Sequence, residues 1–546
     1  MVPFSKYDNS THIRVRQFVS AKGIGLANTG EKKQDDIVIV GAGAAGLSAA
    51  LYLKKQGYKN VTVLEKLGRV GGLCKTITRD YVNFDLGANY ITPAFREVLK
   101  IAREFGMEMY GERNGKALAF DEKGKPVWKD IWREVRGDLS SWKFLLKCGK
   151  YAWLRYKLQS VINKPGFAGI SEREDLCVSF GQWLEDNELE CLQTIFECPI
   201  TIMGYGYIKC PPNAKYPKNK DPFAQDKEVP APHALKYMSF WTFVTLVAKL
   251  TPVLRWVRWP KRFVLGYQRF WEVIAFNLNV ETRVDIESIH RNVDGKIRVK
   301  YRRLQQHNTH TDPSPVYTHD FDKLIVACPL EGELIETFLK DMTADEKDLL
   351  GHVISYTYKM TSCHVENLGL EEPIVAALPI PEIDTPWAIT QQYDHSDFTQ
   401  FYSRERSNTI NFPEALRLKR QEYADTIKPR FDVTKYDAPP KATQDEHGPG
   451  RVQDHFKKEI DQPVLDFVEK LGGTLGKNDW HTFDLWPYFQ HYRVEEIKEG
   501  YYDRFEALQG VSNTYYVGGL MNFELVNHIM EYSKHIVGTH FPEIRD

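Results

Sequence analysis

Short apolar runs separated by glycines, rather than long amphipathic stretches, dominate the start of the folded part of the chain. Residues 36–40 form a continuous run rich in β-branched side chains, a pattern typical of a strand buried on both faces. A glycine-rich stretch at 41–46 follows at once, good helix formers fill residues 47–56, and a second apolar run occupies 61–66. The pattern predicts a strand, a glycine turn, a helix and a second strand in direct succession.

Similar strand patterns return much later in the chain. Residues 280–289 alternate between apolar and polar positions, and strands are also expected at 296–301 and 322–329. Residues 514–520 form another short apolar run that ends in glycines, and a helix is predicted from about residue 524 to about residue 538.

The expected fold class is α/β, with two domains built from interleaved segments. We expect a discontinuous, Rossmann-type dinucleotide-binding domain made of residues 35–95, 267–344 and 481–546. Residues 96–266 and 345–480 are expected to form an α+β substrate-binding domain with a helical lid. The polar segment 1–34 is predicted to be an N-terminal arm. Loops rich in polar, Pro or Gly residues are predicted at 210–232, 303–320 and 432–453.

Length and charge narrow the class of protein. The chain has 546 residues, too many for one compact core, and its 42% hydrophobic and 27% charged residues are typical of a globular protein. Lys and Arg number 72 against 73 Asp and Glu, a balance that argues against a nucleic-acid partner. The eight cysteines include no CxxC pair or zinc-type cluster, so we expect reduced thiols and no metal site. No apolar run approaches the length of a membrane-spanning helix. We therefore expect a cytoplasmic location, with an organellar one left open by the basic N-terminal residues.

The glycines after the first predicted strand have the spacing of a dinucleotide-binding turn. In this pattern Gly41 permits the tight turn, Gly43 lets the backbone approach a pyrophosphate, and Gly46 allows the helix to pack closely on the strand. Glu65 ends the next predicted strand, where a carboxylate accepts hydrogen bonds from a ribose 2′-hydroxyl. An ordinary surface turn with an exposed acid is the alternative, but the complete strand–turn–helix–strand context favours nucleotide binding.

A second glycine turn follows directly. Arg69, Gly71 and Gly72 come just after the ribose acid, and a further turn contains Asp85 and Gly87. Paired glycines beside an arginine suit a longer dinucleotide, whose second phosphate and ribityl chain the backbone can wrap.

These segments together resemble the flavin amine oxidase and phytoene desaturase superfamily. The resemblance rests on 41–46, Glu65, 69–72, 85–88, the strand near Val284, and Gly518 with Gly519, so it covers nearly the whole chain in order. It implies FAD as the cofactor, and we expect FAD to be bound non-covalently because no cysteine or histidine stands in a context that demands linkage. The residues it implies for binding FAD are Gly41, Gly43, Ala45, Gly46, Glu65, Lys66, Arg69, Gly71, Gly72, Gly87, Ala88, Asn89, Val284, Gly518, Gly519 and Phe523.

Within this superfamily the chain looks most like the bacterial polyunsaturated fatty acid double-bond isomerases. The similar stretches include 486–491, 508–510, 513–518 and 204–207. The resemblance implies a long-chain unsaturated fatty acid, or another apolar small molecule, as substrate. It also implies a flavin-facing wall made of Trp486, Tyr488, Phe489, His491 and Tyr515, and substrate contacts from Lys116, Tyr205 and Tyr237.

Two positions depart from the pattern of that family. The family usually has an acidic residue where this chain has Gly519, so one hydrogen bond to the cofactor must come from elsewhere. The arginine expected to anchor a fatty-acid carboxylate is also unmatched. Lys116 offers a point charge there but lacks the bidentate fork of arginine.

Two acid-free stretches combine tryptophans with basic residues. Residues 139–171 and 230–271 contain no Asp or Glu, and together they hold six of the twelve tryptophans. Trp beside Lys or Arg on an apolar face suits the interface of a membrane, so peripheral membrane contact is one interpretation. The other is that these are ordinary amphipathic helices packed on the core.

Three functions are compatible with these features. The first is a redox-neutral isomerase, in which hydride transfer leaves an allylic cation stabilised by aromatic faces. The second is an oxidase or dehydrogenase that uses the same hydride transfer but passes the electrons to oxygen or another acceptor. The third is a non-catalytic FAD-binding or lipid-carrier protein.

Overall fold

The strand Ile37–Val40 (β1) lies at the centre of a parallel sheet in the computed structural model, where all four of its residues are buried. The structure describes residues 35–79, 82–111, 118–120, 126–128, 133, 136–209, 228–250, 260–304, 315–367, 375–377, 388–391, 398–404, 464, 468–469, 472–475 and 481–544. All of them belong to one unit that begins at Asp35. The predicted arm at 1–34 and the predicted loop at 432–453 lie outside the described residues.

The parallel sheet combines strands from three distant parts of the sequence. Its order is β20-β13-β1-β2-β9, and every neighbouring pair is parallel. Besides β1, the strands are β2 (Val61–Leu64), β9 (Asn279–Glu281), β13 (Lys323–Val326) and β20 (Thr514–Tyr516). The predicted discontinuous α/β fold is therefore present, because residues far apart in the sequence pair in one sheet.

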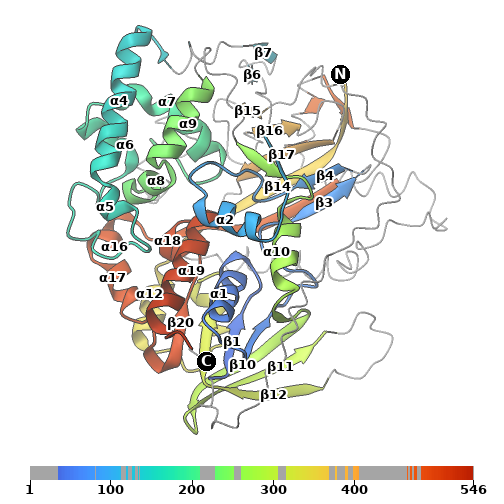
Figure 1. The fold of residues 1–546 in the computed structure, drawn as a ribbon. Helices are drawn as coiled ribbons and strands as arrows, with labels where there is room; N and C mark the ends of the chain where they lie inside the picture. The colour runs from blue at the N-terminus through green and yellow to red at the C-terminus, as the bar shows by residue number, and fades with distance from the viewer. Residues whose placement is uncertain are drawn as a thin grey trace, which may run out of the picture. The chain divides into compact units, whose positions relative to one another are not determined.

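Two helices pack together beside this sheet. Helix α1 (Ala44–Lys55) follows β1 directly and crosses to β2, as its glycine turn and helix formers predict. Helix α19 (Val526–His540) packs on α1, and the hydroxyl of its Ser533 donates to the carbonyl oxygen of Ala45 at 3.1 Å. The end of the chain thus lies against the first helix (Figure 1).

A three-stranded antiparallel sheet flanks the loop predicted at 303–320. Its strands are β10 (Val284–Val293), β11 (Lys296–Arg303) and β12 (Val316–Phe321). The loop predicted over residues 303–320 was too long, because β12 begins at Val316 and pairs with β11 despite its exposed, polar side chains.

A six-stranded antiparallel sheet is the second large sheet. The 13-residue strand β14 (Ile354–Glu366) pairs with β17 on one side and with β19 (His481–His491) on the other. Strand β19 therefore lies in this sheet rather than beside β20, although both belong to the predicted segment 481–546. The remaining strands are β15 (Val375–Ala377), β16 (Ala388–Gln391), β17 (Phe398–Arg404) and β18 (Thr474–Leu475).

A group of helices lies at the end of the unit opposite the β10–β12 sheet (Figure 1). Its members are α4 (Ser141–Lys157), α5 (Gln159–Ile162), α6 (Phe180–Asp186), η1 (Glu190–Leu192), α7 (Gln193–Glu197), η2 (Cys198–Ile202), α8 (Ala231–Tyr237) and α9 (Phe240–Leu250). Helix α8 begins inside the predicted loop 210–232, of which residues 210–227 lie outside the described residues. No helix in the described part of the chain is long and apolar enough to cross a membrane.

Shorter elements complete the described chain. The helices are α2 (Arg96–Glu104), α10 (Tyr267–Ala275), α11 (Gly332–Glu336), α12 (Ala344–Gly351), α16 (Val494–Lys498), α17 (Tyr501–Glu506), η6 (Val511–Asn513) and α18 (Gly519–Asn522). The strands are β3 (Thr76–Arg79), β4 (Val82–Asp85), β5 (Met109–Gly111), β6 (Leu118–Phe120), β7 (Pro126–Trp128) and β8 (Lys261–Phe263).

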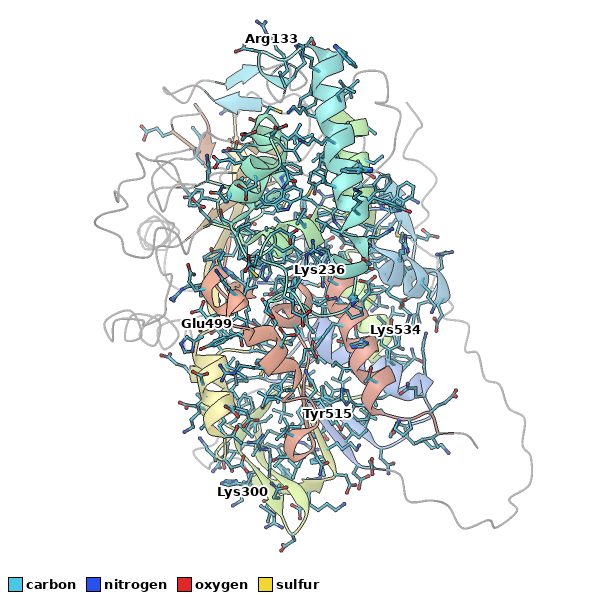
Figure 2. All side chains as sticks on the ribbon, turned by 90° about the vertical axis from the view of Figure 1, so that its left-hand side faces the viewer. Arg133, Lys236, Lys300, Glu499, Tyr515 and Lys534 are labelled. Carbon is cyan, nitrogen blue, oxygen red and sulfur yellow. The ribbon has the colours of Figure 1, made fainter. Side chains whose placement is uncertain are left out.

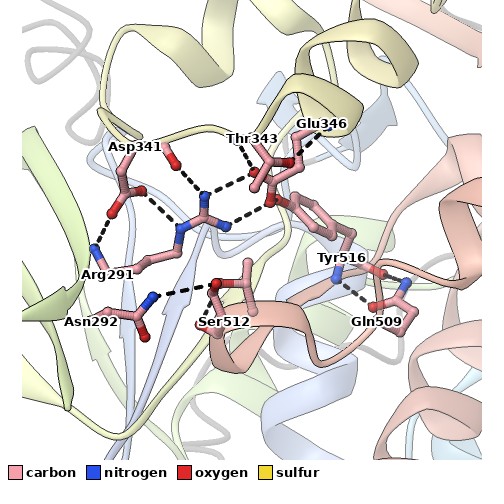
Figure 3. Close-up of polar contacts among 9 residues, drawn as sticks. Arg291, Asn292, Asp341, Thr343, Glu346, Gln509, Ser512 and Tyr516 are labelled. Carbon is pink, nitrogen blue, oxygen red and sulfur yellow. Dashed lines mark hydrogen bonds and ion pairs between the residues drawn. The ribbon is translucent and has the colours of Figure 1, made fainter.

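A buried ion network joins the β10–β12 sheet to the edge of the parallel sheet (Figure 3). The Arg291 guanidinium binds both carboxylate oxygens of Glu346, at 2.6 and 2.8 Å, and its Nε also pairs with Asp341. The hydroxyl of Tyr516 on β20 donates to Glu346 at 2.5 Å. Burial alone would raise the pKa of Glu346, but the hydrogen bonds from Arg291 and Tyr516 outweigh burial and lower the pKa.

Candidate functional site

The turn between β1 and α1 requires glycine at two positions. Gly41 has a φ of 105°, in the left-handed region that favours glycine, and a Cβ there would lie 3.1 Å from the carbonyl of Ala327. A Cβ on Gly46 would lie 1.9 Å from the carbonyl oxygen of Gly41. Only glycine therefore allows α1 to begin this close to the end of β1.

The two glycine turns lie against each other. A Cβ on Gly72 would come within 3.1 Å of the Cα of Gly43, and the N–H of Gly71 donates to the carbonyl of Ala42 at 2.8 Å. Arg69 braces the second turn, because its Nη1 donates to the carbonyl of Gly72 at 2.8 Å. The result is a backbone surface without side chains at the N-terminus of α1, where N–H groups and the helix dipole favour an anion.

Glu65 lies at the carboxyl end of β2 beside this surface. One carboxylate oxygen accepts from the N–H of Ala42 at 2.7 Å, and the other accepts from the N–H of Leu67 at 2.8 Å. Burial raises the pKa of Glu65, while these backbone hydrogen bonds and Arg69 oppose that rise. Because each carboxylate oxygen can accept more than one hydrogen bond, the group remains able to bind a ribose hydroxyl.

Lys66 and Val284, both predicted to bind the cofactor, differ in exposure. The Lys66 side chain is 75% exposed and its ammonium pairs with Asp285 at 3.0 Å, so it points away from the glycine turns. Val284 is buried, and its N–H donates to the carbonyl of Glu65 at 2.8 Å. Val284 therefore lies next to Glu65 at the end of β2.

The turn at Gly87 is packed on the second glycine turn. A Cβ on Gly87 would lie 1.7 Å from the carbonyl oxygen of Leu73, so the two loops meet backbone to backbone. Ala88 and Asn89 follow and are half-buried. Nearby, burial raises the pKa of Asp85 to about 6, although its carboxylate accepts hydrogen bonds from Thr76 and from the N–H of Tyr267.

The segment from Gly518 to Glu524 contains a carboxylate in an unexpected place. A Cβ on Gly519 would lie 2.3 Å from a carboxylate oxygen of Glu524, so Glu524 occupies the space that a side chain at position 519 would fill. Burial, with a smaller contribution from Glu331, raises the pKa of Glu524 to about 7. A carboxylate therefore lies directly beside Gly519, but it comes from Glu524, which the sequence pattern did not single out.

Five predicted residues meet in one aromatic cluster: Tyr205, Tyr237, Tyr488, Phe489 and Phe523. Tyr205 is central, with ring centroids 4.7 Å from Phe523, 5.1 Å from Tyr237, and 5.3 Å from both Tyr488 and Phe489. Its hydroxyl donates to the carbonyl of Glu524 at 3.3 Å, which places the cluster directly beside Glu524.

A β-bulge allows two consecutive residues of β19 to reach this cluster. The pairing of β19 with β14 shifts between the pairs Ile354–His491 and Tyr356–Tyr488, and Phe489 within the shift has a φ of 53°. Regular alternation would send Tyr488 and Phe489 to opposite faces of the strand. The bulge instead brings both rings against Tyr205.

His491 lies behind the cluster. Its ring stacks on Phe489 with centroids 4.2 Å apart, and its Nδ1 is 2.7 Å from the carbonyl oxygen of Phe489. It is buried, so its ring packs on Phe489 within the core. Gln490, between them, donates nothing from its buried Nε2 to any described residue.

Three predicted residues are not part of the cluster. Trp486 packs in a separate group with Leu86 and Met360, which Tyr488 also contacts. The ring of Tyr515 packs on His540 and Phe541, at the far end of α19 and roughly 20 Å along that helix from Phe523. Lys116 lies outside the described residues.

Three functional candidates emerged only from the structure: Tyr90, His233 and Glu524. The hydroxyl of Tyr90 lies 2.5 Å from that of Tyr237. His233 is fully buried among the rings, and burial, with His491 and Lys236, holds its pKa well below the ordinary value. The sequence signal for Glu524 was its position just before α19, five residues after the glycine pair.

Comparison with known proteins supports this reading of the fold. Residues 39–105 match the family described as an NAD(P)-binding Rossmann-like domain. Flavin-containing amine oxidase B of Homo sapiens is 38% identical over 106 residues, which are 18% of this chain and 20% of the human protein. Flavin-containing amine oxidase A of Sus scrofa is 37% identical over the same length. The match spans about a fifth of these relatives.

Similar solved structures cover nearly the whole chain. A fatty acid isomerase from P. acnes that produces CLA has 23% identity and a TM-score of 0.66, covering 93% of this chain and 99% of its own. A putrescine oxidase variant has 14% identity and a TM-score of 0.56, over 92% of this chain and 97% of its own. A cyclohexylamine oxidase from Brevibacterium oxydans has 12% identity and a TM-score of 0.53, over 92% and 98%. The described chain therefore has the fold of these proteins.

Proposed function

We propose that this chain, which shares the fold of flavin amine oxidases and of a fatty acid isomerase, is an FAD-dependent enzyme that isomerises double bonds of a polyunsaturated fatty acid by hydride transfer. The observation that carries the proposal is the aromatic cluster around Tyr205, which lies directly beside Glu524 and Gly519. Flavin-containing relatives in the sequence comparison support the cofactor, and the fatty acid isomerase fold supports the substrate class.

The chain offers a suitable place for each part of FAD. The glycine surface of Gly43 and Gly72 would hold the pyrophosphate, since a side chain there would fill the space. Glu65 would accept a ribose hydroxyl, and the carboxylate of Glu524 over Gly519 would bind the ribityl or ring end. The buried Nε2 of Gln490, next to Glu524 in the fold, is a donor for an acceptor on the same group.

Bound FAD would supply the hydride acceptor and donor. The protein's part is to orient an alkene chain and to stabilise positive charge that develops on it. Burial holds the pKa values of Tyr205 and Tyr488 well above their ordinary value, so both phenols stay neutral and present their ring faces to that charge. Packing by Phe523 and Phe489 excludes water, which would otherwise trap a cationic substrate.

The test is to add linoleic acid to the purified, flavin-loaded protein while recording oxygen uptake and absorbance in the conjugated-diene region. Diene formation without oxygen uptake is the expected result. Oxygen uptake, or flavin bleaching that persists without air, would instead identify an oxidase or dehydrogenase, for which the amine oxidase relatives provide the precedent. Failure to retain FAD during purification would favour a non-catalytic carrier.

A further inference from the structure

Helix α4 has two apolar faces, and within the described part of the chain only one of them is covered. Phe144, Cys148, Tyr151 and Arg155 are buried on its inner side. Five large apolar side chains on the same helix are between 45% and 63% exposed: Trp142, Leu145, Leu146, Trp153 and Tyr156. Their spacing of three, four and seven residues places them on a single stripe along the helix.

Helix α9 lies beside α4 and adds to the exposed apolar surface (Figure 1). The two helices meet through Tyr151 and Phe243, whose ring centroids are 4.3 Å apart. On its exposed side α9 carries Trp241, 50% exposed, and Val244, 37% exposed. The other exposed large apolar side chains of the described residues, such as Phe276, belong to other segments.

The charged side chains on α4 are all positive. The helix contains no acidic residue, and Lys143 and Lys157 are both exposed. The ammonium of Lys157 lies 3.6 Å above the Trp153 ring. Acids are present only on neighbouring segments: Glu188 pairs with Lys150 at 3.0 Å, and Asp138 precedes the helix.

We propose that the exposed face of α4, extended by α9, docks on the surface of an anionic lipid bilayer. Tryptophan and tyrosine on a straight helix of roughly 25 Å, flanked by lysines and free of acids, fit the headgroup boundary of a flat membrane. Lysine side chains at the rim can reach anionic headgroups while the rings enter the boundary.

The inner face of the same helix leads to the aromatic cluster. Tyr151 donates to the carbonyl of Met238 at 2.8 Å, and Arg155 donates to the carbonyl of Leu235 at 2.7 Å, so α4 rests on α8. Helix α8 carries Lys236 and Tyr237, and Figure 2 shows α4 running from near Arg133 toward Lys236. Docking would therefore place the cluster one helix layer from the lipid that, on the proposed function, supplies the substrate.

The test is flotation of the flavin-loaded protein with vesicles of phosphatidylcholine alone and of phosphatidylcholine mixed with phosphatidylserine. The wild type should float with the mixed vesicles and less with the neutral ones. The double variant Leu146→Glu/Trp153→Glu should partition at least about tenfold more weakly, because it places two charges in the apolar stripe. Phe276→Glu, at a residue 86% exposed on another helix end, is the matched control and should behave as wild type.

Folding of each variant is checked by its melting temperature and flavin absorbance. Equal vesicle binding by the double variant, or no binding by the wild type, would overturn the proposal. So would a concentration-dependent dimer, detected by light scattering, that the double variant abolishes, because the stripe would then be an interface between two copies. Vesicle binding without turnover of linoleic acid would contradict the proposed function but support the docking surface.

Discussion

Phe489 and Phe523 both have backbone conformations in the left-handed region, with φ values of 53° and 83°, and their rings meet with centroids 5.5 Å apart. Such conformations cost bulky residues about 1–3 kcal/mol each and persist only where the surrounding structure enforces them. These two strained residues contact each other inside the cluster, next to Glu524. Their backbone strain lowers the stability of the fold and fixes the positions of their side chains.

A buried polar brace holds the second of these residues. The side-chain oxygen of Asn522 accepts from the N–H of Gly166 at 2.9 Å and from the ammonium of Lys236. Its amide donates to the carbonyl of His528 at 2.7 Å. Lys236 also donates to the carbonyls of Lys164 and Gly166, which ties the brace to the chain between α5 and α6.

We therefore predict that Asn522→Ala will loosen Phe523 as well as destabilise the protein. The change removes the Asn522 partner of the Gly166 N–H and of the His528 carbonyl, at a cost of about 1–3 kcal/mol each, and takes one of three acceptors from Lys236. Urea unfolding should show the loss of stability. Kinetics at a temperature where the variant is folded should show a lower kcat, because the ring of Phe523 is no longer held against Tyr237. Asn522→Asp, which keeps an acceptor for Lys236, should retain more of both properties, and equal losses in the two variants would contradict the brace.

The contact between Gly519 and Glu524 gives a reciprocal prediction. Glu524→Ala should weaken FAD binding, because it removes the carboxylate over Gly519. Gly519→Asp in the wild-type background should also weaken it, since its Cβ would lie 2.3 Å from the Glu524 carboxylate. The double variant Gly519→Asp/Glu524→Ala should recover affinity, because it returns one acid to the same space without the clash.

Fluorescence titration of the cofactor-free variants with FAD measures this exchange directly. We expect about a tenfold loss in each single variant and a smaller loss in the double variant, which is a coupling of about 1 kcal/mol or more. Additive losses in the double variant would show that Glu524 does not substitute for an acid at position 519.

The ion network at Arg291 predicts a loss of stability with a defined pH dependence. Arg291→Met leaves the carboxylate of Glu346 buried without its cation, which costs about 3–5 kcal/mol. The folded state holds the pKa of Glu346 below its ordinary value of 4.5. The network therefore stabilises the protein above that pH, and its contribution is lost as the pH falls through the folded pKa.

Thermal unfolding of the wild type and of Arg291→Met, from neutral to acidic pH, checks the prediction. The difference in melting temperature should be largest near neutrality and should shrink in acid, when Glu346 becomes protonated. A difference that stays constant with pH would mean that Arg291 contributes by packing alone.

The parts of the site predicted from the sequence are those that local geometry determines. The turn at Gly41 and Gly46 follows from steric limits within a few residues, so strand, turn and helix could be located before the structure was known. Glu524 was missed because its carboxylate reaches Gly519 only through the positive φ of Phe523 between them. No periodic pattern in the sequence predicts a positive φ at such a position.

The position of Tyr515 outside the cluster has a similar explanation. Tyr515 is close in sequence to Gly518, but its side chain leaves β20 toward His540 and Phe541, whereas the next residue, Tyr516, turns to Glu346. Proximity in sequence therefore did not imply proximity in the site. Tyr488 and Phe489 are together only because of the bulge in β19, which depends on pairing with the distant strand β14.

Tyr205 and Tyr515 together test whether the aromatic cluster acts on a cationic transition state. Tyr205 touches four rings of the cluster, and Tyr515 packs at the far end of α19. Tyr205→Phe keeps the ring face and should keep most of the activity on linoleic acid. Tyr205→Leu keeps an apolar side chain, though a smaller one, and loses the π-face, so kcat should fall about tenfold, in line with a cation–π contribution of about 1–2 kcal/mol.

Tyr515→Leu is the matched control, since it removes an equally buried tyrosine from outside the cluster. It should lower the melting temperature through lost packing while leaving kcat close to that of the wild type. The comparison of Tyr205→Phe with Tyr205→Leu measures the effect of the ring at position 205. Tyr515→Leu loses a ring elsewhere, so it measures the effect of lost packing alone. If Tyr205→Phe loses as much kcat as Tyr205→Leu, the hydroxyl and its hydrogen bond to Glu524, rather than the ring face, carry the role of Tyr205.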